Sequence, residues 1–146
     1  MPKEGLVTKV EITELLSRVP LFSGCSQREV AAIGRAAKEV HRRRGSVLAR
    51  TGEAGVGFFL LVDGDASVLV NGRKRTTLKA GDFFGEISLL DGGPRSADVV
   101  ADTDVTMLGL TAWVFRGVLE QYPSIAQKML VSMAGRLRGA KPNPSD

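Results

Sequence analysis

The sequence predicts a mainly β domain, a β-roll of the jelly-roll type with helices before and after it. Two observations carry this prediction. Between residues 39 and 110, short strand-like runs alternate with glycine-bearing turns, which is typical of sandwiches and jelly-roll barrels. On both sides of this region the apolar residues recur at intervals of three and four, which is the spacing of an amphipathic helix.

The composition is that of an ordinary globular domain. The chain has 146 residues, of which 43% are hydrophobic and 25% charged, and this suffices for a single core. No apolar run approaches the ~20 residues of a membrane span, and the N-terminus lacks the apolar core of a signal peptide. The single cysteine, Cys25, excludes an internal disulfide. We therefore expect a cytoplasmic protein.

Two helices are predicted before the strands. The first covers residues 11–19 and is ended by Pro20, which cannot continue it. The second covers residues 27 to about 38, because Ser26 followed three residues later by Glu29 is a capping box. The apolar residues predicted to face inward are Ile12, Leu15, Leu16, Val19, Val30, Ile33 and Ala37.

Six strands are predicted in the middle of the chain, as short runs bounded by turn residues. Asn71-Gly72 separates the third run from a basic one and is the signal of a two-residue hairpin turn. The six runs are residues 47–50, 58–62, 66–70, 76–78, 96–101 and 105–110.

Two further helices are predicted after the strands. Thr111 caps the first, over residues 112–120, where we expect Trp113 to anchor the helix on the roll. The second covers residues 124–138, with Pro123 in its first turn. Its inward stripe is Ile125, Met129, Met133 and Leu137. We thus divide the chain into an N-terminal helical segment (1–20), the domain proper (21–138) and a flexible tail (139–146).

The most informative stretch is residues 84–101. Gly85 and Glu86 stand at the start of a predicted one-turn helix, and Arg95 opens a strand nine residues after Glu86. A helix N-terminus and an arginine both suit a phosphate. A glutamate repels phosphate but can accept hydrogen bonds from a sugar hydroxyl. The pattern therefore predicts a pocket for one phosphate and one ribose, as in a mononucleotide.

This stretch resembles the phosphate-binding cassette of the cyclic nucleotide-binding domain family. That family includes the bacterial catabolite activators, the regulatory subunits of cAMP-dependent kinase and the cyclic-nucleotide-gated channels. The resemblance covers about residues 21–138, and residues 52–70 are similar to the glycine-punctuated strand pair that leads into the cassette. The matching cassette residues are Gly85, Glu86, Ile87, Leu89, Leu90, Pro94, Arg95, Ser96 and Ala97.

The resemblance implies a binding site made of particular residues. Arg95 would receive the cyclic phosphate and Glu86 the ribose hydroxyl, while Ser96 would add a hydroxyl to the phosphate. An arginine of the last helix, Arg136, would lie over the base. The full implied set is Gly85, Glu86, Ile87, Arg95, Ser96, Ala97 and Arg136.

The function implied is that of a sensor. Cyclic AMP is favoured over cGMP, because Ser96 resembles the serine of the cAMP-responsive bacterial activators. We expect no catalytic activity, no metal and no cofactor. The helices that follow residue 110 would rearrange on binding and signal to an unknown partner or attached effector. A homodimer through the C-terminal helix is possible. Neither a DNA-reading domain nor a membrane pore fits into 146 residues.

Two other functions stay open. One is an interaction module that has lost nucleotide binding. Asp98 is its best support, since strand alternation from Ser96 would place its carboxylate on the phosphate side, or against Arg95 in the empty state. The other is a nucleic-acid binder that uses the basic runs, because the chain has a formal net charge of +4. These runs are residues 42–44, 73–75 and Arg136, Arg138 and Lys141.

Overall fold

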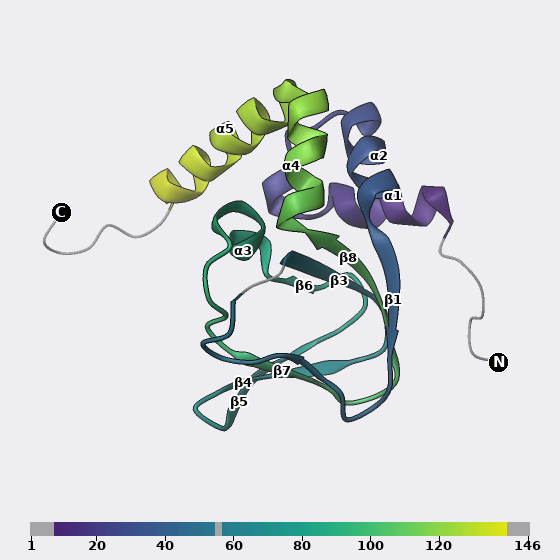
Figure 1. Ribbon diagram of the computed structural model, residues 1–146, viewed down its shortest axis with the longest axis vertical. Coiled ribbons are helices and arrows are strands. Elements are labelled where there is room, and N and C mark those ends of the chain that lie inside the picture. The colour runs from purple at the N-terminus through teal and green to yellow at the C-terminus, as the bar shows by residue number, and fades with distance from the viewer. Residues whose placement is uncertain (1–7, 55–56, 140–146) are drawn as a thin grey trace, which may run out of the picture.

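The computed structural model describes residues 8–54 and 57–139 (Figure 1). Within these residues it has two antiparallel four-stranded sheets, in the orders β1-β8-β3-β6 and β2-β7-β4-β5. The mainly β fold with flanking helices is therefore confirmed. The elements are α1 (Lys9–Ser17), the 3-10 helix η1 (Pro20–Phe22), α2 (Gln27–Ala36), β1 (Lys38–Arg42), β2 (Val47–Ala49), β3 (Gly57–Asp63), β4 (Ala66–Val70), β5 (Arg73–Leu78), β6 (Phe83–Phe84), α3 (Glu86–Asp91), β7 (Asp98–Ala101), β8 (Val105–Thr111), α4 (Ala112–Gln121) and α5 (Pro123–Gly139).

The helices other than α3 gather at one end of the roll, and α3 lies between them and the strands (Figure 1). They are held there by three aromatic rings. Phe22 of η1 lies 6.1 Å from Phe58 of β3 and 6.0 Å from Phe115 of α4, measured between ring centroids. All three side chains are fully buried, and each buries a large apolar area. A second apolar cluster lies between the two sheets and includes Leu61 and Met107.

Several local predictions are confirmed. The Ser26–Glu29 capping box begins α2, and Thr111 caps α4 through a hydrogen bond from the Val114 amide. Asn71 and Gly72 both have positive φ, 52° and 77°, as a type I′ hairpin turn between β4 and β5 requires.

Other element boundaries differ from the prediction. Helix α2 stops at Ala36, and Lys38 already belongs to β1, a strand that the sequence did not predict. Strand β1 lies at the edge of its sheet and is largely exposed, so it needs no apolar alternation. Strand β6 is only two residues long and was also missed. Strand β7 begins at Asp98 rather than at Ser96.

Two predicted inward side chains face solvent. Trp113 is 82% exposed, so it does not anchor α4; Phe115 and Val118 do so instead. In α5, Ile125 and Met129 are buried and Met133 is partly buried, but Leu137 is 75% exposed. The last turns of α5 extend past α4 toward the side of α3 (Figure 1), where they have less structure to pack against.

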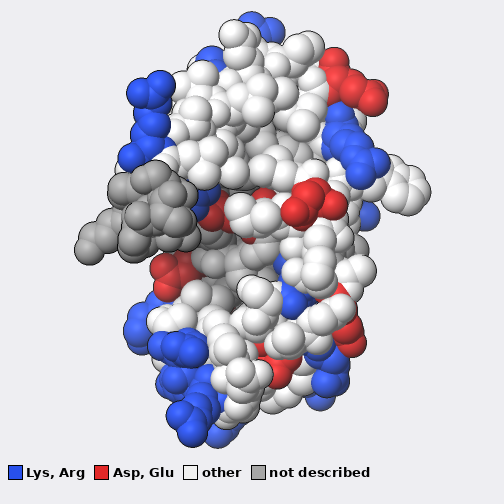
Figure 2. All heavy atoms as spheres, turned by 90° about the vertical axis from the view of Figure 1, so that its left-hand side faces the viewer, with Lys and Arg blue, Asp and Glu red and all other residues white. Residues whose placement is uncertain are grey.

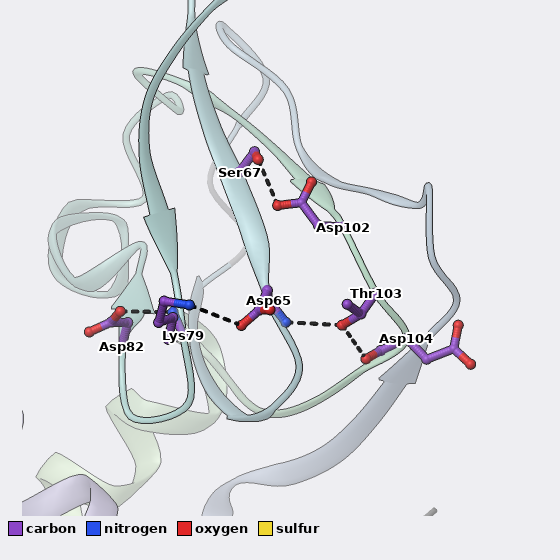
Figure 3. Close-up of polar contacts among 7 residues, drawn as sticks. All are labelled: Asp65, Ser67, Lys79, Asp82, Asp102, Thr103 and Asp104. Carbon is purple, nitrogen blue, oxygen red and sulfur yellow. Dashed lines mark hydrogen bonds and ion pairs between the residues drawn. The ribbon is translucent and has the colours of Figure 1, made fainter.

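The end of the roll away from the helices is closed by turns that hydrogen-bond to one another (Figure 3). The Asp65 amide donates to Thr103 Oγ1 at 3.0 Å, and Ser67 Oγ donates to Asp102 at 2.7 Å. Lys79 Nζ lies 3.9 Å from Asp65. These contacts join the β3–β4, β5–β6 and β7–β8 turns to one another.

Glu29 joins α2 to α5. Its side chain is buried and accepts hydrogen bonds from the Ser26 amide at 2.8 Å, from Ser124 Oγ and from Lys128 Nζ. These donors, led by Lys128, lower the pKa of Glu29 to about 2. One turn further on, Ser132 Oγ donates to the Pro20 carbonyl at 2.8 Å. The first half of α5 is thus tied to the N-terminal helices. No helix among the described residues is long and apolar enough to cross a membrane.

The Glu29 network predicts a pH-dependent stability difference. Glu29→Gln keeps an acceptor for the cap but loses the ion pair, so we expect it to lower the free energy of unfolding by about 1–3 kcal/mol. Because the pKa of Glu29 falls from 4.5 to about 2 on folding, the wild-type advantage is complete above pH 4.5. It is lost as the pH falls through about 2.

Urea unfolding of both proteins at a series of pH values measures this difference. Glu14→Gln is the matched control, because Glu14 is an exposed helical glutamate and should show no such dependence. A wild-type advantage that stays constant on acidification would contradict the network.

Candidate ligand-binding site

The cassette residues line one cavity between α3 and the roll. Its volume is about 520 Å³. The face of the molecule in Figure 2 is hollowed midway between the helices and the strands, with acidic and basic atoms around the hollow. The lining residues come from β2, β4, β5, β7 and the chain between β5 and β7. They are Ala49, Val68, Leu78, Phe83, Phe84, Gly85, Glu86, Ile87, Ser88, Asp91, Gly93, Pro94, Arg95, Ser96, Ala97 and Val99.

Gly85 makes the sharp turn into α3. Its φ is +85°, a left-handed conformation that side-chain-bearing residues seldom adopt. A Cβ at this position would lie 2.2 Å from Arg95 Nη1 and 2.3 Å from the Gly57 carbonyl oxygen. The missing side chain therefore makes room for the Arg95 guanidinium and for β3.

Arg95 is held by its backbone and by an aromatic ring. Its amide donates to the Glu53 carbonyl at 2.8 Å, and its own carbonyl accepts from the Gly52 amide at 2.9 Å. The guanidinium carbon lies 5.6 Å from the centroid of the Phe84 ring, within the range of a cation–π contact. Burial lowers the pKa of Arg95. Its Nη1 is buried and has no hydrogen-bond partner among the described residues.

The two carboxylate oxygens of Glu86 differ in their hydrogen bonding. Arg136 Nη2 of α5 donates to Glu86 Oε1 at 2.8 Å, and this contact raises the pKa of Arg136. Glu86 Oε2 is buried without a hydrogen-bond partner in the described part of the chain. Among the described residues, the buried donor at Arg95 and the buried acceptor at Glu86 thus both lack a partner, and each is costly to leave unpaired.

The other predicted residues lie on the walls. Ile87 is half exposed and presents an apolar surface, while Ser96 and Ala97 form a bend before β7. The structure thus brings all six predicted cassette residues to one cavity. Arg136 is not among the lining residues and reaches the site through Glu86.

The lining residues that the sequence analysis did not predict include Phe84, Ser88 and Asp91. Phe84 lies beneath the Arg95 guanidinium. Ser88 Oγ donates to the Gly93 carbonyl at 3.2 Å and so braces the loop after α3. The position of Ser88 and Asp91, two and five residues after Glu86 within the same short helix, is the signal that could have identified them.

Asp98 does not lie where the sequence placed it. Strand β7 begins at Asp98, and residues 96–97 form a bend, so the alternation assumed from Ser96 does not hold. Asp98 Oδ1 accepts from the Thr51 amide at 2.7 Å, which lowers the pKa of this carboxyl. Asp98 is absent from the cavity lining and makes no ion pair with Arg95. It pins the loop after β2 instead of opposing an anion.

Comparison with known proteins places this geometry in a family. The model of the cyclic nucleotide-binding domain matches residues 39–122. The chain belongs to the cyclic nucleotide-binding domain family. The resemblance of the cassette is thereby confirmed, and the matched region includes every cassette residue. Arg136 of α5 lies outside it.

The relatives include channels, kinase subunits and transcription regulators. The chain is 36% identical over 129 residues to a cyclic nucleotide-gated potassium channel of Rhizobium etli. It is 36% identical over 115 residues to a cAMP-dependent protein kinase regulatory subunit of Aspergillus niger, and 28% identical over 138 residues to a CRP-like cAMP-activated global transcriptional regulator of Mycobacterium tuberculosis. These alignments cover 88%, 77% and 91% of the chain, but only 36%, 28% and 62% of the relatives.

Solved structures show the same architecture. The N-terminal domain of a transcriptional regulator from Streptomyces coelicolor superposes with a TM-score of 0.79 at 29% identity, covering 86% of this chain and 93% of that one. The catabolite activator protein of Thermus thermophilus superposes with a TM-score of 0.67 at 30% identity, covering 82% and 59%.

The close packing around Gly85 predicts that Gly85→Ala destabilises the protein. A left-handed conformation costs a residue with a side chain about 1–2 kcal/mol, and overpacking adds about 1–3 kcal/mol. We expect a loss of at least about 2 kcal/mol in chemical unfolding. Gly135→Ala in α5 is the control, since a Cβ there meets no atom within 4 Å. Equal stability of the two variants would contradict the strained turn and the close packing at Gly85.

Proposed function

We propose that the cavity binds a cyclic nucleotide, with cAMP favoured, and that the chain is a sensor without catalytic activity of its own. One observation carries the proposal: Arg95 Nη1 and Glu86 Oε2, both of residues that line the same cavity, are buried without a hydrogen-bond partner among the described residues. A cyclic phosphate would supply the anion that Arg95 lacks, and the ribose 2′-hydroxyl would supply the donor that Glu86 lacks. Relatives named as cAMP-activated or cAMP-dependent support the choice of ligand.

The position of Asp98 weakens the alternative of an interaction module that has lost nucleotide binding. That alternative rested on a carboxylate facing the phosphate, whereas Asp98 is hydrogen-bonded outside the cavity. For the nucleic-acid alternative, the cationic residues 73–75 are exposed on the edge strand β5, whereas Lys141 lies outside the described residues. Charges there also protect a sheet edge from pairing with another chain.

Isothermal titration with cAMP and cGMP tests the proposal. We expect both to bind and cAMP to be modestly preferred, since the Ser96 hydroxyl can also reach a guanine amino group.

Arg95→Ala should lose about 2–5 kcal/mol of binding free energy, roughly 30-fold or more in affinity. Its unfolding transition without ligand should stay near that of wild type, because Nη1 makes no hydrogen bond to lose. Arg75→Ala, an exposed cation of β5, serves as the control. Binding within about threefold of wild type in Arg95→Ala would rule out the phosphate role.

We further propose that α5 is the lid of the site. Its base is tied to α2 through Glu29, and its far end reaches the cassette through the Arg136–Glu86 ion pair. A ligand that engages Glu86 Oε2 would act on the carboxylate that Arg136 holds. It could then shift the position of α5 by its differential affinity for the two arrangements. The exposed apolar residues Leu130, Val131 and Leu137 offer a surface to an effector or to a second copy of the chain.

The lid proposal predicts faster ligand release from Arg136→Ala. Removing this partly exposed ion pair, worth up to about 1 kcal/mol, should raise the dissociation rate of a fluorescent cAMP analogue several-fold in stopped-flow displacement. Arg138→Ala, two residues further on the same helix, should leave the rate unchanged. An identical dissociation rate in wild type and Arg136→Ala would remove Arg136 from the site.

A further inference from the structure

The cavity lining contains only three ionisable side chains among the described residues: Glu86, Asp91 and Arg95. Glu86 is neutralised by Arg136 at 2.8 Å. Arg95 and Asp91 share the cavity without forming an ion pair within 4.0 Å, since Arg95 Nη1 has no partner in the described chain. The site therefore offers one positive charge without an ion-pair partner among the described residues, and one negative charge from Asp91.

The loop after α3 orients the carboxylate of Asp91. Asp91 is the last residue of α3, and its Oδ1 accepts from the Gly93 amide at 2.7 Å. The Gly93 carbonyl in turn accepts from Ser88 Oγ, which is buried. A Cβ at Gly93 would lie 2.9 Å from Asp91 Oδ1, so the carboxylate rests against this turn. It is a fixed part of the wall, four residues before Arg95 along the loop.

The charge of the ligand decides how it meets this arrangement. A cyclic nucleotide is a phosphodiester with one negative charge, which Arg95 alone can balance. A linear mononucleotide is a phosphomonoester whose second proton leaves with a pKa near 6, so it carries almost two charges at neutral pH. The second charge would find no cation in the lining and would be repelled by Asp91. Asp91 is an exposed residue, so the repulsion is that of two charges near a protein surface rather than in a dry interior.

We propose that Asp91 is a specificity residue that selects singly charged cyclic nucleotides against doubly charged linear ones. This inference rests on the proposed function of the cavity. Hydrolysis of a cyclic phosphodiester yields the linear phosphomonoester, so Asp91 would prevent the sensor from responding to the hydrolysis product of its own ligand.

Competition titrations of cAMP and 5′-AMP with wild type and Asp91→Asn test this role. Asparagine keeps the Oδ1 acceptor for the Gly93 amide, so the turn is retained and only the charge is removed. Removing one negative charge several ångströms from the ligand, near a surface, should raise cAMP affinity by a factor f on the order of 2–3. At about pH 8, 5′-AMP carries about two negative charges. Its affinity should therefore rise by about f squared. At about pH 5.5 the monoester is mostly singly charged, and its gain should fall to about f.

Asp98→Asn is the matched control, because Asp98 also accepts a backbone hydrogen bond but does not line the cavity. It should change the affinity of neither ligand by more than about twofold. Equal gains for both ligands in Asp91→Asn at about pH 8, or no gain at all, would overturn the specificity role while cAMP binding itself stands. Failure of wild type to bind cAMP would overturn the proposed function, and this inference with it.

Discussion

The site depends on one half-buried cation, Arg95, whose buried Nη1 has no anion beside it among the described residues. Removing a charge from water costs several kcal/mol unless a partner replaces the water, and Arg95 Nη1 has no such partner in the described chain. The fold holds Arg95 in place through its backbone and through its side chain. The Glu53 carbonyl and the Gly52 amide hold its backbone, and the Phe84 ring lies beneath its guanidinium. An anion that enters the cavity meets a donor that is already oriented, so little ordering is required on binding.

Helix α5 connects this site to the rest of the molecule. Two carboxylates form ion pairs with α5: Glu29 with Lys128 in its first half, and Glu86 with Arg136 near its C-terminal end. The contact at Glu29 joins α5 to α2, and Ser132 joins it to η1. The contact at Glu86 joins it to the cassette helix α3. Helix α5 therefore connects the cassette to the N-terminal helices by contacts that do not involve the sheets.

Local signals in the sequence predicted most of the fold. The Ser26 and Thr111 caps and the Asn71-Gly72 turn act through neighbouring backbone groups, so a few residues suffice to specify them. Where burial by distant elements decided the structure, the sequence was a weaker guide. Strand β1 exists because it pairs with β8, although its own side chains are mostly exposed. Trp113 is large and apolar, yet the face of α4 on which it lies has no element packed against it.

The sequence by itself determined the family and the cassette, since Gly85, Glu86 and the run from Pro94 to Ala97 form a contiguous pattern with a fixed spacing. Only the tertiary structure decided which charges face one another. It joined Arg136 to Glu86 across fifty positions of the chain, placed Asp91 on the cavity wall, and turned Asp98 away to the Thr51 amide. The reason is physical: a motif specifies side chains and local turns, whereas the partner of a charge depends on elements that meet only when the chain folds.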